Sequence, residues 1–438
     1  MNIELINTGS ELMLGRVQNT HQQWLCRRLA DLGHVVTRQV AVADEGSQIQ
    51  QAVREALGRA DLIITTGGLG PTSDDITREL IAGLLGLKLV ENREVLAHIE
   101  NFFARRGRPR PAKTSVETLV PEGALVFLNP TGTAPGLAMK IGAGVWDSAA
   151  KEKSVLEALS QGPGSKTPQK KWLVMLPGPP RELRPMFDES VVPLLKQEFA
   201  DELFICRTLR TTGIGESRVQ EMVEADLQPL VQSGLGIGYC ARPGAVDVRL
   251  TAGGVTAATL VHDGETVVRR ILGANIFGFD DDELEFVVVK RLTEMKKTLA
   301  LAESCTGGSI AQRVTDVPGA SAVFLGGVVS YANSAKENIL GVRAESLARH
   351  GAVSEAMAVE MAAGAREKFG ADFALAVTGI AGPGGGTPEK PVGTVYIALA
   401  AATGVEVKGF LNVWDRATFK QVTAAQALEM LRIRLVSA

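Results

Sequence analysis

Two adjacent aspartates, Asp74 and Asp75, end a glycine-rich stretch that spans residues 65–75 with the sequence TTGGLGPTSDD. The preceding Thr72 or Ser73 is expected to cap a helix, whose free N–H groups attract an anion. Two carboxylates would repel a phosphate unless a divalent cation joined them, and Mg²⁺ is commonly held by carboxylates together with phosphate oxygens. The stretch therefore predicts a metal-assisted site for a nucleotide or a pyrophosphate. The alternative is that both aspartates only complement the dipole of the helix.

The elements around this stretch must bring its polar residues to one place. Three glycines would let the backbone approach a ligand closely, and these are Gly67, Gly68 and Gly70. The apolar residues 61–66 before the turn predict a buried strand, and residues 76–85 after it have helical spacing. The stretch is therefore expected to join a strand to a helix.

The preceding residues also alternate between strand and helix patterns. Strands are predicted at residues 3–8 and 35–42, and helices at residues 19–32 and 47–57. Such alternation predicts a parallel sheet covered by helices on both faces, with ligands beyond the carboxyl ends of its strands. Glu11 follows the first strand and would lie at the same rim as the two aspartates. It is a candidate third acidic ligand, or otherwise a solvated loop charge.

Length and composition indicate an ordinary globular protein of several domains. The chain has 438 residues, 45% hydrophobic and 22% charged, with a net charge of −3. This length predicts about two or three domains, and the charge gives no sign of nucleic-acid binding. The four cysteines form no CxxC pair, which favours a reducing cytoplasm over a zinc site or a disulfide framework. We expect no signal peptide and no membrane span, because the first residues lack a basic region and a long apolar run.

Four motifs in the amino-terminal half carry a family resemblance: NTGSELMLG, TTGGLGPTSDDITRE, NPTGTAPG and LPGPPREL. They resemble the amino-terminal domain of the CinA (competence/damage-inducible protein) family, which is similar to the molybdopterin-binding fold. The resemblance implies a parallel-sheet domain over residues 1–202 with ADP-ribose pyrophosphatase activity. A divalent metal (Mg, Mn or Co) would be the cofactor, with Glu11, Asp74 and Asp75 as its ligands and the three glycines against the substrate. Residues 143–171 are interpreted as a surface insertion.

Residues 203–279 predict a small α+β unit. Two short strands at residues 235–240 and 245–251 flank a turn, and helices are expected from residue 215 to about 225 and over residues 256–272. This unit resembles the KH-like middle domain of the same family. A KH domain holds RNA with a GxxG clamp and a basic surface, and no such clamp stands out here. We therefore expect a spacer or a dimer contact.

The last part of the chain, residues 280–438, predicts a three-layer α/β/α domain. Its motifs are AESCTGGSIAQRV, PGASAVFLGGVVSYANSAK, VTGIAGPGGGTPEKPVGTVYIA and the pair Asp415-Arg416. They resemble the nicotinamide mononucleotide amidase domain that also closes CinA proteins. The resemblance implies hydrolysis of the nicotinamide mononucleotide amide to nicotinate mononucleotide and ammonia, in pyridine nucleotide salvage, without a cofactor. The fold class of the whole chain is thus multidomain α/β.

An amidase needs a nucleophile, a base and an oxyanion hole. No histidine lies in these motifs, so a Ser–Lys pair is the remaining choice. By resemblance, Ser321 is the nucleophile, Lys336 the base and Tyr331 a partner in proton transfer. The alternatives are a turn cap for Ser321 and a helix-surface position for Lys336. Cys305 is a rival nucleophile, but no histidine or cation flanks it, which favours a buried structural cysteine.

The resemblance also implies how the amidase domain holds its substrate. Arg416 would bind the phosphate, since its planar fork suits bidentate contact. The whole substrate-binding set comprises Ser304, Thr306, Gly307, Thr378, Gly379 and Arg416. The expected partners are small nucleotides and a second copy of the chain, in the cytoplasm, with no nucleic acid and no membrane. A different class of function stays open: a catalytically silent nucleotide- or molybdopterin-binding regulatory protein.

Overall fold

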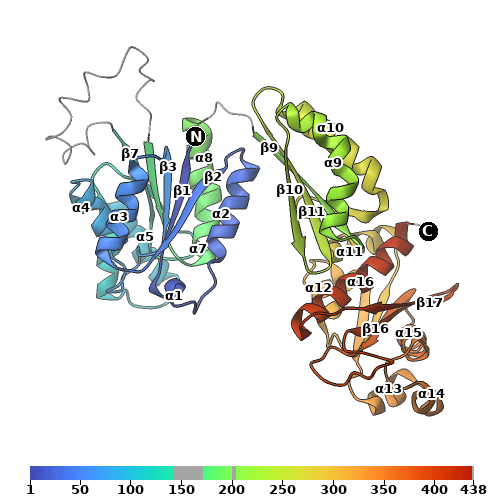
Figure 1. Cartoon of the computed structure of the whole chain (residues 1–438). Coiled ribbons are helices and arrows are strands. Elements are labelled where there is room, and N and C mark those ends of the chain that lie inside the picture. The colour runs from blue at the N-terminus through green and yellow to red at the C-terminus, as the bar shows by residue number, and fades with distance from the viewer. Residues whose placement is uncertain (143–170, 200–203, 437–438) are drawn as a thin grey trace. The chain divides into compact units, whose positions relative to one another are not determined.

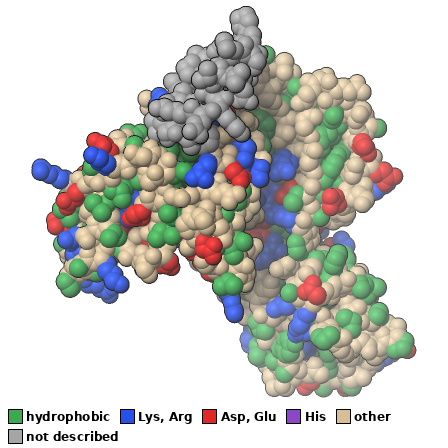
Figure 2. Space-filling model, turned by 60° about the vertical axis from the view of Figure 1, so that its left-hand side comes forward, with side chains coloured by type: hydrophobic (Ala, Val, Ile, Leu, Met, Phe, Trp, Pro, Cys, Tyr) green, Lys and Arg blue, Asp and Glu red, His purple; other side chains and the backbone are tan. Residues whose placement is uncertain are grey.

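The computed structural model describes residues 1–142, 171–199 and 204–436. The chain divides into two compact units, Met1–Ile205 and Cys206–Ala438 (Figure 1). The predicted surface insertion, apart from Lys171, and the predicted domain boundary at residue 202 lie outside the described residues. Within the described ranges, no helix is long and apolar enough to cross a membrane. Both acidic and basic side chains appear across the part of the surface that Figure 2 shows.

The first unit is built on a six-stranded sheet with the order β2-β1-β3-β8-β7-β6. The first four strands of this order are parallel, as predicted, whereas β7 is antiparallel to both of its neighbours, β8 and the edge strand β6. Its strands are β1 (Ile3–Thr8), β2 (Val36–Val42), β3 (Leu62–Thr66), β6 (Leu125–Phe127), β7 (Gly136–Ile141) and β8 (Lys171–Leu176). A separate ribbon pairs β4 (Leu89–Glu91) with β5 (Leu119–Pro121).

Helices cover both faces of this sheet (Figure 1). Successive side chains of β3 point to opposite faces, so Ile63 joins one hydrophobic cluster while Leu62 and Ile64 join another. The first cluster lies under α3 (Gly46–Leu57), α4 (Thr77–Leu84) and α5 (Arg93–Ala104). The second lies under α2 (Thr20–Asp31), α7 (Pro180–Met186) and α8 (Val192–Glu198). Burial on both faces explains the continuous apolar run of this strand.

The helical segment that closes the first unit, residues 180–198, is interrupted. A π-helical turn, η3 (Phe187–Val191), separates α7 from α8. Pro193 stands in the first turn of α8 and has no backbone N–H, so it cannot donate to the carbonyl of Glu189. A turn with wider hydrogen-bond spacing accommodates this missing donor.

The middle domain contains a four-stranded sheet with the order β10-β11-β9-β12, packed against two helices. The elements are β9 (Phe204–Thr212), α9 (Glu216–Gln232), β10 (Gly236–Arg242), β11 (Ala245–Gly253), α10 (Ala257–Leu272) and β12 (Ile276–Phe279). Helix α9 extends beyond the predicted end near residue 225, because the buried stripe of Val219 and Val223 continues to Leu227. The strand β12 was not predicted; at four residues it is too short for a clear pattern.

The carboxyl-terminal domain is built on a five-stranded sheet with the order β14-β13-β15-β16-β17. Strand β13 is parallel to both neighbours, whereas β16 is antiparallel to β15 and β17. The strands are β13 (Leu299–Glu303), β14 (Phe324–Val329), β15 (Phe373–Gly379), β16 (Thr394–Ala401) and β17 (Gly404–Leu411). The helices are α11 (Leu284–Met295), α12 (Ser309–Thr315), α13 (Asn333–Leu340), α14 (Ala344–His350), α15 (Glu355–Phe369) and α16 (Arg416–Val436).

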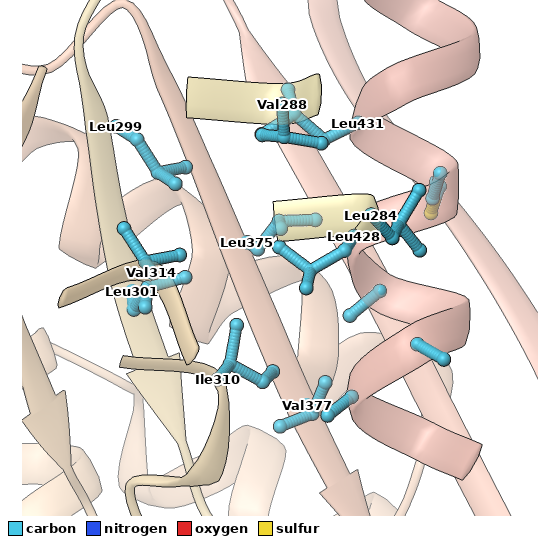
Figure 3. Close-up of a cluster of buried hydrophobic side chains, with 14 of the residues drawn as sticks. Leu284, Val288, Leu299, Leu301, Ile310, Val314, Leu375, Val377, Leu428 and Leu431 are labelled. Carbon is cyan, nitrogen blue, oxygen red and sulfur yellow. The ribbon is translucent and has the colours of Figure 1, made fainter. Parts of the chain in front are cut away.

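The two faces of this sheet use side chains of different size. On one face, leucines and valines of β13 and β15 meet α11, α12 and α16 in the cluster of Figure 3. On the other face, alanines of the same strands meet alanines and methionines of α15. Small side chains let this helix lie close to the sheet. The result is the three-layer α/β/α domain that the sequence predicts.

Strand β14 differs from the other strands of this parallel group in its surroundings. Its sequence is apolar, but it is an edge strand with a single neighbour, β13. Leu325 and Val329 are 45% and 52% exposed. An apolar run alone does not distinguish an edge strand from a buried one.

Candidate active sites

Ser304 and Lys336 meet at the carboxyl end of strand β13. Ser304 directly follows the strand, and its backbone N–H donates to the carbonyl of Val377 in the neighbouring strand β15, at 3.0 Å. Lys336 comes from α13, which follows the parallel neighbour β14 and lies over the same end of the sheet. The Lys336 Nζ lies 3.2 Å from Ser304 Oγ and 2.7 Å from the carbonyl oxygen of Ser330. The contact has the distance of a hydrogen bond.

Burial favours the neutral form of the Lys336 amine. The side chain of Lys336 is 1% exposed, and desolvation lowers its pKa because the charged ammonium loses its hydration. The neighbouring Cys305 is affected in the opposite way, since burial raises the pKa of its thiol to about 12. The thiol therefore stays protonated and is a poor nucleophile. The prediction that Cys305 is a buried cysteine is confirmed.

The structure does not bring Ser321, the predicted nucleophile, next to Lys336, the predicted base. Ser321 lies in a short 3₁₀ turn, η5 (Ala320–Ala322), before the amino end of β14. Lys336 lies beyond the carboxyl end of the same strand, and six residues of strand span roughly 20 Å. A proton cannot pass directly between groups at opposite ends of a strand. Ser304, predicted only as a substrate-binding residue, is the hydroxyl that lies within hydrogen-bond distance of Lys336 instead.

Glu303 holds the turn that carries Ser304, a role that sequence reasoning missed. Its buried carboxylate accepts hydrogen bonds from the backbone N–H groups of Gly308 at 3.0 Å, Ile310 at 3.1 Å and Ala311 at 2.8 Å. These groups belong to the start of α12, whose free N–H groups favour a negative charge. The sequence signal that could have indicated this role is a glutamate at the end of a strand, directly before a glycine-containing turn.

Two predicted residues meet at an exposed edge of this site. The Arg416 guanidinium donates to the Tyr331 hydroxyl and to the carbonyl oxygen of Gly382, both at 2.8 Å. The Tyr331 side chain is 63% exposed, and a role for it in proton transfer stays a prediction. Phosphate binding by Arg416 also stays a prediction.

Two buried threonines line the surroundings of Ser304. Thr378 is the residue after Val377 in β15, and its hydroxyl donates to the carbonyl oxygen of Ala352 at 2.6 Å. Thr306, two residues after Ser304, is fully buried, and among the described residues its hydroxyl has no hydrogen-bond partner. Substrate contacts by these threonines, and by Gly307 and Gly379, are not tested by the geometry.

The structure brings the predicted amino-terminal residues together in one cavity of about 340 Å³. It lies beyond the carboxyl ends of β1, β3 and β8, as expected for a parallel sheet. Its walls include all six residues that the sequence indicated, Glu11, Gly67, Gly68, Gly70, Asp74 and Asp75. Three further carboxylates line it that sequence reasoning missed: Asp44, Glu117 and Glu182.

Two glycines allow this cavity to form. Gly67 and Gly68 have φ angles of 98° and 69°, which other residues rarely adopt. A Cβ atom at Gly67 would lie 2.7 Å from the carbonyl oxygen of Thr8, and one at Gly68 would collide with the side chain of Thr77. The turn therefore packs directly against β1 and α4.

Asp75 holds the turn rather than capping the helix. Helix α4 begins at Thr77 after Ile76, without a side-chain cap, so the predicted cap by Thr72 or Ser73 is wrong. Instead, the Asp75 carboxylate accepts hydrogen bonds from the backbone N–H and the hydroxyl of Thr72. The chain turns once more between these residues and α4, which displaces the aspartates from the first helical turn.

The carboxylates of this cavity differ in how well they suit a metal ion. The nearby Thr72 side chain and the backbone N–H of Asp74 itself lower the pKa of the exposed Asp74, so this group is ionised at neutral pH. Across the described ranges, no three His, Cys, Asp or Glu side chains are already grouped to hold a metal ion. Mg²⁺ is often held by one or two carboxylates and completed by substrate phosphates, which fits Asp74 and Asp75.

The comparisons with known proteins cover the whole length of the chain. Residues 4–197 match the model of a probable molybdopterin binding domain, residues 206–278 the KH domain of damage-inducible protein CinA, and residues 281–435 the CinA C-terminal domain. A CinA-like protein of Akkermansia muciniphila is 43% identical over 427 residues, which cover 97% of this chain and 95% of that protein. A putative competence-damage inducible protein of Thermoanaerobacter pseudethanolicus is 42% identical, with coverage of 98% and 97%.

A solved structure also matches part of the chain. The competence/damage inducible protein CihA from Agrobacterium tumefaciens is 44% identical, with a TM-score of 0.34. The match covers 35% of this chain and 93% of that one.

Proposed function

This chain belongs to the CinA family, and we propose that its carboxyl-terminal domain hydrolyses the amide of nicotinamide mononucleotide with Ser304 and Lys336 as the catalytic residues. The observation that carries the proposal is the 3.2 Å contact between Ser304 Oγ and a buried lysine amine. Burial favours the neutral amine, and a neutral amine can accept the hydroxyl proton.

The first chemical step transfers the acyl group to the serine. Ser304 Oγ forms a bond to the amide carbonyl carbon while its proton moves to Lys336 Nζ. The tetrahedral intermediate then breaks its C–N bond, Lys336 returns the proton to the leaving nitrogen, and ammonia departs. The enzyme is left with a nicotinoyl ester on Ser304 and a neutral lysine.

The second step releases the acid by the same route in reverse. A water molecule gives a proton to Lys336 and attacks the ester carbonyl carbon. The ester C–O bond breaks, Lys336 returns the proton to Ser304 Oγ, and nicotinate mononucleotide leaves. No other proton carrier is needed, which agrees with the lack of histidine in the site motifs.

In this proposal, the surrounding residues position the Ser304 hydroxyl and the substrate. The backbone hydrogen bond from Ser304 to Val377 fixes the nucleophile beside Thr378, which would orient the reacting amide. Arg416, at the exposed edge beside Tyr331, would bind the phosphate of the substrate.

The test is ammonia release by the purified full chain from nicotinamide mononucleotide, without added metal. We expect steady turnover in the wild type and none in Ser304→Ala. A folded wild-type protein that releases no ammonia would overturn the proposal. In that case, ligand-induced stabilisation without turnover would favour the alternative of a silent nucleotide- or molybdopterin-binding regulatory protein.

A second function is proposed for the amino-terminal cavity: metal-dependent cleavage of ADP-ribose to AMP and ribose 5-phosphate. The observation that favours it is the gathering of Glu11, Asp74 and Asp75 with the glycine turn around one cavity. A divalent cation held by Asp74 and Asp75 and completed by substrate oxygens would neutralise part of the charge of the pyrophosphate, with Glu11 elsewhere in the wall of the same cavity. The turn itself brings backbone close to the substrate.

ADP-ribose cleavage should therefore require added Mg²⁺, Mn²⁺ or Co²⁺ and should stop with EDTA. Asp75→Asn should reduce it strongly, while Asp263→Asn, an exposed position on α10, should not. Cleavage that persists in EDTA, or in Asp75→Asn, would refute the proposed metal site.

A further inference from the structure

Lys420 is a partly buried cation beside the turn that carries Ser304. It lies on α16, next to Phe419, which is fully buried in the hydrophobic cluster of the domain. A Cβ atom placed on Gly307 would lie 3.6 Å from Lys420 Nζ, so the ammonium group lies directly over this glycine. The backbone N–H of Gly307 donates to the carbonyl oxygen of Ser304 at 3.2 Å, which makes both residues part of one tight turn. Lys420 therefore faces the turn of the proposed nucleophile.

This ammonium group has no acidic partner. Among the residues that the structure describes, Lys420 forms no ion pair and no hydrogen bond. The acidic residue of the turn, Glu303, already accepts hydrogen bonds from three backbone N–H groups. Lysine is seldom removed from water without a partner charge, because its ammonium group loses hydration. A partly buried ammonium group without an anion beside it indicates an anionic ligand.

A second cation, Arg416, stands on the same face of α16. Residues four positions apart are neighbours on the surface of a helix. The Arg416 guanidinium donates to the Tyr331 hydroxyl and to the carbonyl oxygen of Gly382, and neither of these neutral groups cancels its charge. One cation thus lies at Tyr331 and the other at Gly307, so an anion with several acceptor oxygens can bind both.

The helix terminus itself does not supply this attraction. The Asp415 carboxylate accepts hydrogen bonds from the backbone N–H groups of Ala417 and Thr418, so the first turn of α16 is already capped by a negative charge. The two basic side chains are therefore the groups that an anion would meet.

We propose that Lys420 binds the phosphate of the mononucleotide together with Arg416, and that this pair selects mononucleotides over the corresponding nucleosides. The inference rests on the proposed amidase function for the choice of ligand. Nicotinamide mononucleotide has a cationic pyridinium ring and a neutral amide, so its phosphate is its only anionic group. The phosphate offers three strong acceptor oxygens, which suit a planar arginine fork and a lysine point charge at once.

Two substitutions separate the charge of Lys420 from its packing. Lys420→Met keeps the apolar stem over Gly307 and removes the charge, whereas Lys420→Arg keeps a charge. The matched control is Lys368→Met, at an exposed position on α15. The substrates are nicotinamide mononucleotide and nicotinamide riboside, which differ only in the phosphate. Ammonia release by the full chain gives kcat and KM, and circular dichroism would establish that each variant is folded.

We expect Lys420→Met to raise KM for the mononucleotide about tenfold or more, with kcat within about threefold of the wild type. Lys420→Arg should recover most of this loss, and added salt should raise KM more in the wild type than in Lys420→Met. The riboside should be a poorer substrate, with the same kcat/KM in Lys420→Met and the wild type. An unchanged KM for the mononucleotide in Lys420→Met would overturn the inference. Equal losses with both substrates would also overturn it, because the charge would then act on the reacting amide.

The result is separable from the proposed reaction. If the folded wild type releases no ammonia, calorimetry with the intact mononucleotide replaces the kinetic assay. Binding that is about tenfold weaker in Lys420→Met, with Lys368→Met unchanged, would mean that the reaction is wrong and the phosphate contact holds. A wild type that does not bind the mononucleotide would refute both. If the wild type releases ammonia and KM is unchanged in Lys420→Met, the reaction holds and the phosphate contact is wrong.

Discussion

The Lys336 Nζ lies 3.2 Å from Ser304 Oγ although the two residues are 32 positions apart in the chain. Strands β13 and β14 are parallel neighbours, and the residues that follow them emerge at the same end of the sheet. The backbone N–H of Ser330, just after β14, donates to the carbonyl of Glu303 at 2.8 Å and ties the two strand ends together. Ser304 and Lys336 therefore meet because β13 and β14 are parallel.

Ser304→Ala is expected to lower amidase kcat by several orders of magnitude, because the covalent route loses its nucleophile. Ser321→Ala, at the other end of β14, should stay within about twofold of the wild type. Ammonia release under saturating substrate measures both. An inactive Ser321→Ala beside an active Ser304→Ala would reverse the assignment. The double variant of Ser304 and Lys336 to alanine should lose little more than either single one, since the two residues act as a unit.

Amidase activity should rise with pH as Lys336 loses its proton. Its pKa is lowered by burial, so the rise should be complete below the ordinary lysine pKa of 10.5. Lys336→Arg should be inactive at every pH, because a guanidinium stays protonated. The control is Lys368→Arg, an exposed position on α15. A pH–kcat profile settles the point, and an active Lys336→Arg would exclude lysine as the base.

Glu303→Gln should weaken both the domain and its reaction. The glutamine amide would face three backbone N–H groups that now donate to a carboxylate, and an unsatisfied buried group costs about 1–3 kcal/mol. We expect urea unfolding to show a loss of that size, and kcat to fall because the turn carrying Ser304 shifts. Glu345→Gln, exposed on α14, is the matched control. Unchanged stability would mean that the carboxylate is not needed for the cap.

Glu117 should make the first unit less stable as pH rises. Its folded pKa of about 7 lies above the ordinary value of 4.5, so the folded state binds more protons between these values. The free energy of unfolding should therefore fall between pH 4.5 and 7, by up to about 3 kcal/mol from this group. Glu117→Gln should lack this part of the pH dependence.

Tryptophan fluorescence can measure this effect in the full chain. In a Trp414→Phe background, the remaining tryptophans, Trp24, Trp146 and Trp172, all belong to the first unit. Unfolding curves at pH 5 and pH 7.5 would then report that unit alone. Identical pH dependence with and without Glu117→Gln would show that Glu117 titrates at its ordinary pKa in the folded state.

Much of the fold followed from local patterns in the sequence. The strand ahead of the glycine turn was visible as an apolar run, and the helix α2 as periodic apolar residues. The amino-terminal cavity was also accessible, since its glycines and aspartates are adjacent in the chain. Local patterns suffice where the residues that meet in space are also close in sequence.

Sequence patterns did not indicate the features that depend on contacts between residues distant in the chain. Ser304 and Ser321 both stand at glycine-marked turns, and only the direction of the strands shows which one reaches Lys336. Glu117 lies in a 3₁₀ segment without hydrophobic periodicity, more than forty residues after Asp75, and reaches the cavity through packing. Neither position carries a local signal for its partner.

The buried thiol of Cys305, next to the proposed nucleophile Ser304, makes the proposed amidase site accessible to chemical labelling experiments. Cys305 is protonated and shielded, whereas Cys240 is exposed, so iodoacetamide should modify Cys240 quickly and Cys305 only when the turn after β13 opens. The rate of Cys305 alkylation would then measure how often this turn opens. Substrate bound against Ser304 should lower that rate. Cys305, which has no part in the proposed reaction, would in this way report on movements of the neighbouring Ser304.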